Sequence, residues 1–135
     1  MKRIIAQCLE WSPAVSRWMF IPCLLGVLTL ALMPSGVAPS FAWSALVNHV
    51  AAFTALAGLL ATGWPRLPVW ATALGLMALG GVIELTQGLA LFSRQPDWID
   101  IAANGVGVAL GLSLAFGLRA TRMRLTAPLP AALPQ

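Results

Sequence analysis

The sequence feature that most constrains the fold is a long uncharged stretch: residues 18–65 contain no Asp, Glu, Lys or Arg. Over the whole chain of 135 residues, 59% are hydrophobic and only 9% are charged, against about 25% charged in a typical globular protein. A soluble domain of this size could not cover its surface with so few charges. The chain therefore belongs in a lipid bilayer, and its length fits a single domain.

Four membrane-spanning helices are predicted, because about 20 apolar residues are needed to cross a bilayer. The uncharged stretch is too long for one helix, and the sequence PSGVAPS at residues 34–40 divides it in two, since proline, glycine and serine favour loops. The resulting fold class is an all-α, polytopic bundle of four transmembrane helices. The predicted segments are an N-terminal segment at 1–13, helices at about 14–33, 44–63, 69–92 and 98–118, and a basic, proline-rich tail at 119–135.

The basic residues predict the orientation of this bundle, because cytoplasmic loops carry an excess of Lys and Arg. Four crossings leave Arg94 alone on one side of the membrane, and both termini are predicted to be cytoplasmic. A cleaved signal peptide is the less favoured alternative, because the segment before the first apolar run is long and contains Glu10. The basic residues predicted on the cytoplasmic side are Lys2, Arg3, Arg17, Arg66, Arg119, Arg122 and Arg124.

Polar residues gather near one predicted end of the bundle, in the leaflet that faces away from the cytoplasm. The second and fourth helices begin there and the third ends there, so distant segments meet at one level in a pocket open to the outside. At 1.5 Å per residue, Glu84 lies about 12 Å from the predicted end of its helix. The polar residues of this predicted pocket are Asn48, His49, Glu84, Gln87, Arg94, Asp97, Asp100 and Asn104.

The candidate catalytic residues are the groups of this pocket that can carry a proton: His49, Glu84 and Asp100. A carboxylate within an apolar helix is costly and is functional by default, although Glu84 would also fit a structural ion pair with Arg94. His49 suits proton transfer near neutral pH and equally suits a structural hydrogen bond. Asp97 is better explained as a helix cap, because it forms with Asp100 the spacing of a capping box.

The candidate ligand-binding residues are Asn48, Gln87, Arg94 and Asn104, of which Asn48 also fits a helix cap. A histidine and up to three carboxylates could converge, but their spacing matches no established metal-ligand motif, so neither a metal site nor a cofactor is predicted. The basic residues form no patch with interleaved aromatic side chains, and nucleic acid is therefore not an expected partner. The glycines expected to serve helix packing are the GxxxG pair Gly107 and Gly111, with Gly80, Gly81 and Gly88 around Glu84.

This pattern of polar residues resembles that of the VanZ-like family of small bacterial membrane proteins. The similar segments are IELTQ at 83–87, then Arg94, then DIAANGVGVALG at 100–111, with NHVAAFTALAGLL at 48–60 similar to a histidine-led second helix. The chain departs from the family just before that histidine, where Ala45-Leu46 replaces a common Asp-Lys pair. The resemblance implies a multi-pass protein of the bacterial cytoplasmic (inner) membrane and a role in resistance to the antibiotic teicoplanin.

Three functions fit these residues. In the first, the outer-leaflet pocket binds or acts on a cell-envelope component, such as a lipid-linked precursor or a lipoglycopeptide, with or without catalysis. In the second, the protein is a proton- or ion-coupled transporter that uses Glu84, and its four-helix chains would form a homo-oligomer. In the third, it is a non-catalytic membrane scaffold in which Glu84 and Arg94 hold helices together.

Overall fold

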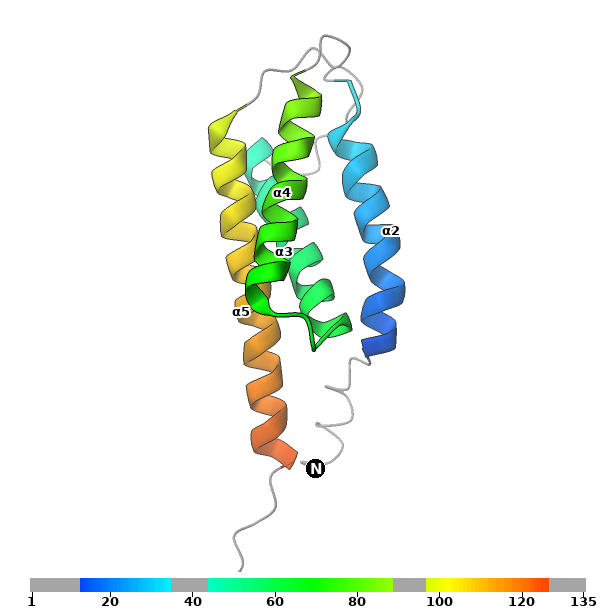
Figure 1. Cartoon of the computed structure of the whole chain (residues 1–135), viewed down its shortest axis with the longest axis vertical. Coiled ribbons are helices and arrows are strands. Elements are labelled where there is room, and N and C mark those ends of the chain that lie inside the picture. Colours follow the sequence, from blue (N-terminus) through cyan, green and yellow to red (C-terminus); the bar gives the residue numbers. More distant parts are fainter. Residues whose placement is uncertain (1–12, 35–43, 89–96, 127–135) are drawn as a thin grey trace, which may run out of the picture.

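Four long helices form the part of the protein that a computed structural model describes, namely residues 13–34, 44–88 and 97–126 (Figure 1). Each helix is long and apolar enough to span a membrane, and the described residues contain no strand. The chain is therefore an all-α, multi-pass membrane bundle, which confirms the fold class predicted from the uncharged stretches. The helices are α2 (Pro13–Ala31), α3 (Ala45–Gly63), α4 (Val69–Gln87) and α5 (Trp98–Thr126).

Helix α3 is the centre of the bundle, because it packs against α2, α4 and α5 and makes its most extensive contact with α5. Its buried side chains include Phe53, Leu56 and Ala57, which meet Leu76 of α4 and the inward-facing apolar residues of α5. Large hydrophobic side chains such as those of Leu85 and Trp98 cover the outside of the bundle. That outer surface suits hydrocarbon rather than water, as a membrane bundle requires.

The contact between α3 and α5 is closest at two glycines of α5. A Cβ atom on Gly107 would lie 2.6 Å from the backbone oxygen of Val50, and one on Gly111 would overlap the backbone oxygen of Thr54. Any side chain at these positions would force the helices apart. The GxxxG pair therefore lets two helices of the same chain approach closely, which is the general use of small residues at helix interfaces in membranes.

The third helix ends earlier than its apolar pattern predicts. Helix α4 stops at Gln87, and Gly88 follows as its C-cap, with its backbone N–H donating to the carbonyl of Glu84 at 3.0 Å. Residues 89–92, the last part of the predicted helix, lie outside the described residues. Glu84 is therefore three residues from the end of α4, or about 4.5 Å along the axis, rather than about 12 Å.

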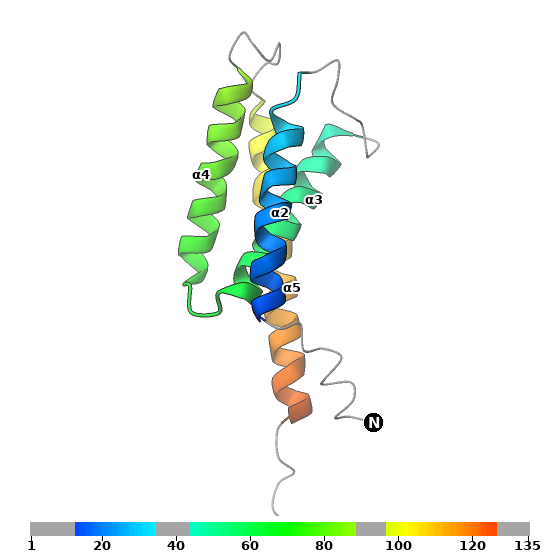
Figure 2. The same ribbon diagram turned by 90° about the vertical axis from the view of Figure 1, so that its right-hand side faces the viewer.

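The last helix is longer than predicted, because α5 continues through residues 119–126 (RATRMRLT), the first part of the predicted tail. These residues are mostly good helix formers and include neither proline nor glycine, so nothing local stops the helix before Pro128. Both views show this part of α5 projecting beyond the ends of the other helices (Figures 1 and 2). The rest of the predicted tail, residues 127–135, lies outside the described residues.

The end of the bundle at which α3 finishes is held by two arginines. Arg17 of α2 donates from Nε to the carbonyl of Gly63 at 2.7 Å, and its guanidinium lies 5.7 Å from the ring centre of Trp64. Arg119 of α5 donates to the carbonyl of Ala61. The last carbonyls of a helix lack partners within the helix and attract cations. Two neighbouring helices therefore cap α3 and fix its position in the bundle.

Candidate functional site

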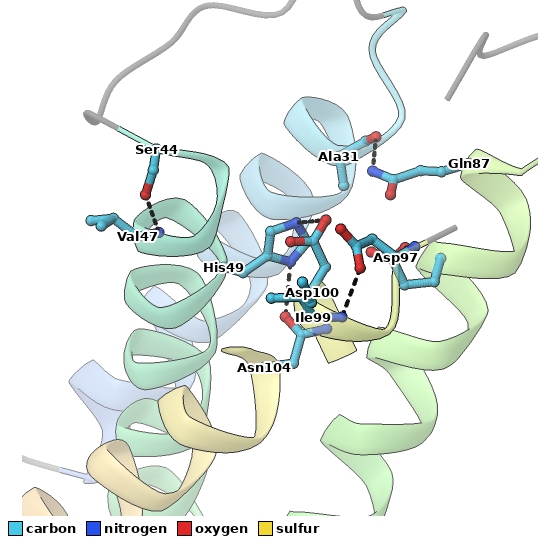
Figure 3. A network of polar contacts seen from close by, with 10 residues as sticks. Ala31, Ser44, Val47, His49, Gln87, Asp97, Ile99, Asp100 and Asn104 are labelled. Carbon is cyan, nitrogen blue, oxygen red and sulfur yellow. Dashed lines mark hydrogen bonds and ion pairs between the residues drawn. The ribbon is translucent and has the colours of Figure 1, made fainter. Parts of the chain in front are cut away.

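Polar side chains from three helices meet where α3 begins, α4 ends and α5 begins (Figure 3). His49 lies in the second turn of α3, Glu84 in the last turn of α4, and Asp100 in the first turn of α5. One ring nitrogen of His49 and one carboxylate oxygen from each acidic residue lie within 4.8 Å of one another. The structure therefore brings together the three residues predicted to carry protons, and Asn104 with them.

The two ring nitrogens of His49 face different partners. Nδ1 lies 2.9 Å from Oδ1 of Asn104, and Nε2 lies 3.5 Å from Oδ2 of Asp100 (Figure 3). An amide oxygen can only accept a hydrogen bond, so Nδ1 carries the hydrogen in this arrangement. Asn104 thus orients the ring and leaves Nε2 toward Asp100. The side chains of His49 and Asp100 are 15% and 20% exposed, so the pair is within reach of molecules outside the bundle.

Asn104 is held in place by a close fit rather than by a second hydrogen bond. Its side chain is fully buried, and its Nδ2 has no hydrogen-bond partner among the described residues. A Cβ atom on Gly80 of α4 would lie 2.6 Å from that nitrogen and 3.2 Å from the ring of Phe53. Gly80 therefore provides the space that the Asn104 amide occupies, whereas a Cβ on Gly81 would meet nothing within 4 Å.

Glu84 is the most buried acidic group of the cluster, with 2% of its surface exposed. Its Oε2 accepts a hydrogen bond of 3.1 Å from the backbone N–H of Asp97, at the start of α5. Its Oε1 is buried and has no partner within the described part of the chain. Leaving a buried polar atom unpaired is costly, so this oxygen is available for a proton, a hydrogen-bond donor or a cation.

Asp97 caps α5, as its position in the sequence predicts. Its Oδ1 accepts a hydrogen bond of 2.8 Å from the backbone N–H of Ile99, and its own carbonyl accepts from Asp100 and Ile101. The predicted capping box is wrong in its second half, because the N–H of Asp97 bonds Glu84 instead of the side chain of Asp100. That side chain consequently faces His49.

The other predicted ligand-binding residues do not join this cluster. Gln87 is buried, and its Nε2 donates to the carbonyl of Ala31 at 2.7 Å, which links the end of α4 to the end of α2 (Figure 3). Asn48 is half-buried beside His49, and the cap of α3 is Ser44, whose hydroxyl accepts from Val47 at 3.3 Å. Arg94 lies outside the described residues, as does its predicted ion pair with Glu84.

One polar contact at the opposite end of the bundle has no counterpart among the sequence predictions. The hydroxyl of Thr62 in α3 donates to the hydroxyl of Ser16 in α2 at 2.8 Å, and Ser16 is fully buried. Ser16 lies three residues after the start of α2, where a hydroxyl has no distinctive sequence signal. Its partner lies 46 positions away, so only the packing of α2 on α3 reveals the contact.

Comparison of the chain with protein-family models, with curated proteins and with solved structures gives no significant match. The function of the cluster is therefore inferred from its own side chains and their positions.

Proposed function

We propose that this protein acts at the outer leaflet of a bacterial cytoplasmic membrane, where its polar cluster binds or acts on a cell-envelope component or a lipoglycopeptide. The observation that carries the proposal is the convergence of His49, Glu84 and Asp100 from three helices within 4.8 Å. Ionisable groups inside membrane bundles are expensive to maintain, and their grouping at one site is typical of function. The pattern shared with the VanZ-like family supports the same role.

The cluster has the groups needed for proton transfer at a bound headgroup. Asn104 orients the ring of His49 through Nδ1 and leaves Nε2 beside the carboxylate of Asp100, so that Nε2 and this carboxylate are the groups that can accept a proton from a bound ligand. The unpaired oxygen of Glu84 suits a hydroxyl or amine donor of the ligand. Arg94, which the sequence places in the adjoining segment, suits an anionic group.

The distribution of arginines supports an outward-facing cluster. Successive helices run in opposite directions (Figure 1). All five arginines of the described residues therefore lie at the end of the bundle opposite to His49. Lys and Arg are enriched on the cytoplasmic side of membrane proteins. The cluster then lies within the outer leaflet, where envelope precursors and glycopeptide drugs are exposed. The basic residues concerned are Arg17, Arg66, Arg119, Arg122 and Arg124.

The proposal is tested by teicoplanin susceptibility in a Gram-positive host that expresses this protein or its Glu84→Gln variant at matched membrane levels. We expect the wild-type protein to raise the minimum inhibitory concentration of teicoplanin and the variant to lose this protection. Vancomycin, which lacks a lipid tail, serves as the control drug. Asp97→Asn is the matched control variant, since it removes a neighbouring carboxylate while asparagine caps a helix as well as aspartate does.

Four outcomes would contradict the proposal. Absence of protection by the wild-type protein would exclude a teicoplanin-resistance role, and equal protection by Glu84→Gln would exclude the cluster as the working site. A fall in protein abundance that accounts for the lost protection would favour the scaffold hypothesis. Solute flux in proteoliposomes that depends on both a pH gradient and Glu84 would instead favour the transporter hypothesis.

A further inference from the structure

We propose that His49, Glu84 and Asp100 bind a divalent transition-metal ion, and that Zn²⁺ fits their donor atoms best. The inference deepens the proposed function and rests on it only in taking this cluster as the working site. A bound ion would give the cluster a direct means of holding an oxygen atom of a headgroup. The site would be formed by one imidazole nitrogen and two carboxylate oxygens, each from a different helix.

The spacing of the donor atoms is close to that of a zinc site. Zinc bonds nitrogen and oxygen at about 2.0–2.2 Å in tetrahedral geometry, so neighbouring ligand atoms lie about 3.4 Å apart. Nε2 of His49 and Oδ2 of Asp100 are already 3.5 Å apart. The ligand atoms of all three residues lie within 4.8 Å of one another. A shift of the Glu84 carboxylate by roughly 1.4 Å toward the other two residues would bring three ligand atoms to the spacing of a tetrahedral site.

The unpaired oxygen of Glu84 is independent evidence that the cluster lacks a partner. The side chain is almost fully buried, yet Oε1 accepts no hydrogen bond from any described residue. Polar atoms buried in protein are satisfied in the great majority of cases, and the exceptions point to an ion, a water or a catalytic role. A cation held between Glu84, His49 and Asp100 would supply the missing partner.

The orientation of His49 favours a cation over a proton alone. Because Asn104 fixes the hydrogen on Nδ1, the lone pair of Nε2 in a neutral ring points toward the carboxylate of Asp100. Two acceptors then face each other. A proton on Nε2 would relieve that pair but would leave Oε1 of Glu84 without a partner among the described residues and the two carboxylates only half neutralised. A divalent ion would neutralise both, and the Nδ1–H bond to an oxygen is the usual support of a metal-bound histidine.

The donor set also indicates the ion and its ligand. Imidazole with carboxylates and without thiolates suits zinc and its first-row neighbours rather than Ca²⁺ or Mg²⁺. Three protein ligands leave the fourth tetrahedral position of zinc open, as in catalytic rather than structural sites. We expect an anionic oxygen of the headgroup, such as a phosphate oxygen, or an activated water to take that position.

The test is metal binding by the full chain, purified in detergent through an affinity tag that contains no histidine and stripped with a chelator. Calorimetric titration with Zn²⁺ and elemental analysis should give about one ion per chain for the wild-type protein and for Asp97→Asn. Loss of a residue that only supports a metal ligand weakens metal binding by about 10- to 100-fold. Asp100→Asn and His49→Ala each remove a direct ligand, so each should weaken zinc binding by more than that. Elution profile and melting temperature show that each variant is folded.

Asp97→Asn and Asp100→Asn form a matched pair, because each removes one carboxylate from the start of α5 and only Asp100 lies in the cluster. His49 is the chain's only histidine, so a visible Co²⁺ spectrum that disappears in His49→Ala reports on this site alone. Absence of stoichiometric binding to the wild-type protein would overturn the inference. So would binding that persists in His49→Ala, which would point to thiols such as Cys23.

Failure of this inference is distinguishable from failure of the proposed function. Zinc binding is measured on purified protein without any drug, and teicoplanin protection is measured in cells without added metal. Protection that depends on Glu84 in a protein that binds no zinc would overturn only the metal site. Zinc binding that depends on His49 in a protein that gives no protection would overturn only the teicoplanin role.

Discussion

The position of Asn104 determines what His49 can do. An amide oxygen at 2.9 Å holds the hydrogen on Nδ1 and directs Nε2 toward the acidic residues. Asn104 itself depends on Gly80, since any side chain there would overlap its amide. A glycine on one helix thus controls the chemistry of a histidine on another, although the two residues make no hydrogen bond with each other.

Gly80→Ala should therefore disturb the cluster without removing a polar group. We expect overpacking to lower the free energy of unfolding by about 1–3 kcal/mol, measured by denaturant titration in mixed micelles. The ¹⁵N resonances of the single imidazole should shift as the hydrogen bond to Asn104 is lost. The neighbouring substitution Gly81→Ala, with nothing within 4 Å of its Cβ, should leave those resonances unchanged and be neutral or stabilising by up to about 1 kcal/mol.

Equal shifts in the two variants would show that Gly80 does not position Asn104. An unchanged imidazole spectrum in Gly80→Ala would mean that the amide can move aside without releasing His49. Either result would show that the packing of α4 against Asn104 does not determine the orientation of the His49 ring.

Sequence periodicity predicts that the polar residues of the cluster lie at the same depth in the membrane, but it does not predict which of them contact each other. Helical spacing and the order of crossings bring His49, Glu84, Asp100 and Asn104 to the same end of the bundle. Glu84 and Gln87 are three residues apart, a spacing at which side chains can be neighbours on a helix, yet such residues differ by about 60° around a helix of 3.6 residues per turn. Gln87 accordingly bonds Ala31 of α2, while Glu84 faces α5. That divergence depends on how α4 is rotated in the bundle, which no local pattern specifies.

At the scale of helices, α3 and α5 make the most extensive contact in the bundle, and α2 and α4 pack against this pair. Helices α3 and α5 approach so closely that the backbone of α3 lies against Gly107 and Gly111. Packing of this kind replaces the hydrophobic effect as the attraction between helices in lipid. It also fixes the depth of His49 relative to Asp100 and Asn104, because these residues lie on the two helices concerned.

Gly111→Ala should weaken the contact between α3 and α5, whereas Gly117→Ala on the same helix should not. A Cβ at position 111 would overlap Thr54, while one at position 117 would meet nothing within 4 Å. We expect a loss of about 1–3 kcal/mol in unfolding free energy for the first variant. The second should be neutral or gain up to about 1 kcal/mol from helix propensity. Unfolding in mixed micelles would measure both, and equal stabilities would contradict the close packing of α3 on α5.

Helix starts are more predictable from this sequence than helix ends. The predicted starts lie within one residue of those observed for all four helices, because proline and serine mark a start locally. A helix end depends more on the residues beyond the apolar pattern. Helix α4 ends at Gln87, earlier than that pattern predicts, and α5 continues through a basic segment whose composition is typical of a tail but whose residues favour helix.

At the scale of the whole molecule, charge is segregated along the bundle axis. The described arginines lie at one end and the acidic cluster at the other, with apolar helices between them. Such segregation matches the asymmetry of a cell membrane, in which basic residues are retained on the cytoplasmic side. The predicted orientation, with both termini in the cytoplasm, rests on that distribution.

Reporter fusions test this orientation directly. A fluorescent protein joined after Gln135 should be fluorescent in a Gram-negative host, and alkaline phosphatase at the same position should be inactive, because both report a cytoplasmic location. Alkaline phosphatase inserted between the first two helices should be active. The reverse pattern would place the cluster on the cytoplasmic side and would contradict a role at the outer leaflet.

The shared length of three helices has a consequence for access to the cluster. Helices α2, α3 and α4 have 19 residues each, or about 28 Å, close to the roughly 30 Å hydrocarbon thickness of a bilayer. His49 and Glu84 lie within two turns of helix ends, so the match of protein to lipid sets their distance from water. Thicker bilayers would submerge them beneath the headgroups and thinner ones would raise them to the surface. The length of the lipid chains would thereby determine which molecules can reach His49.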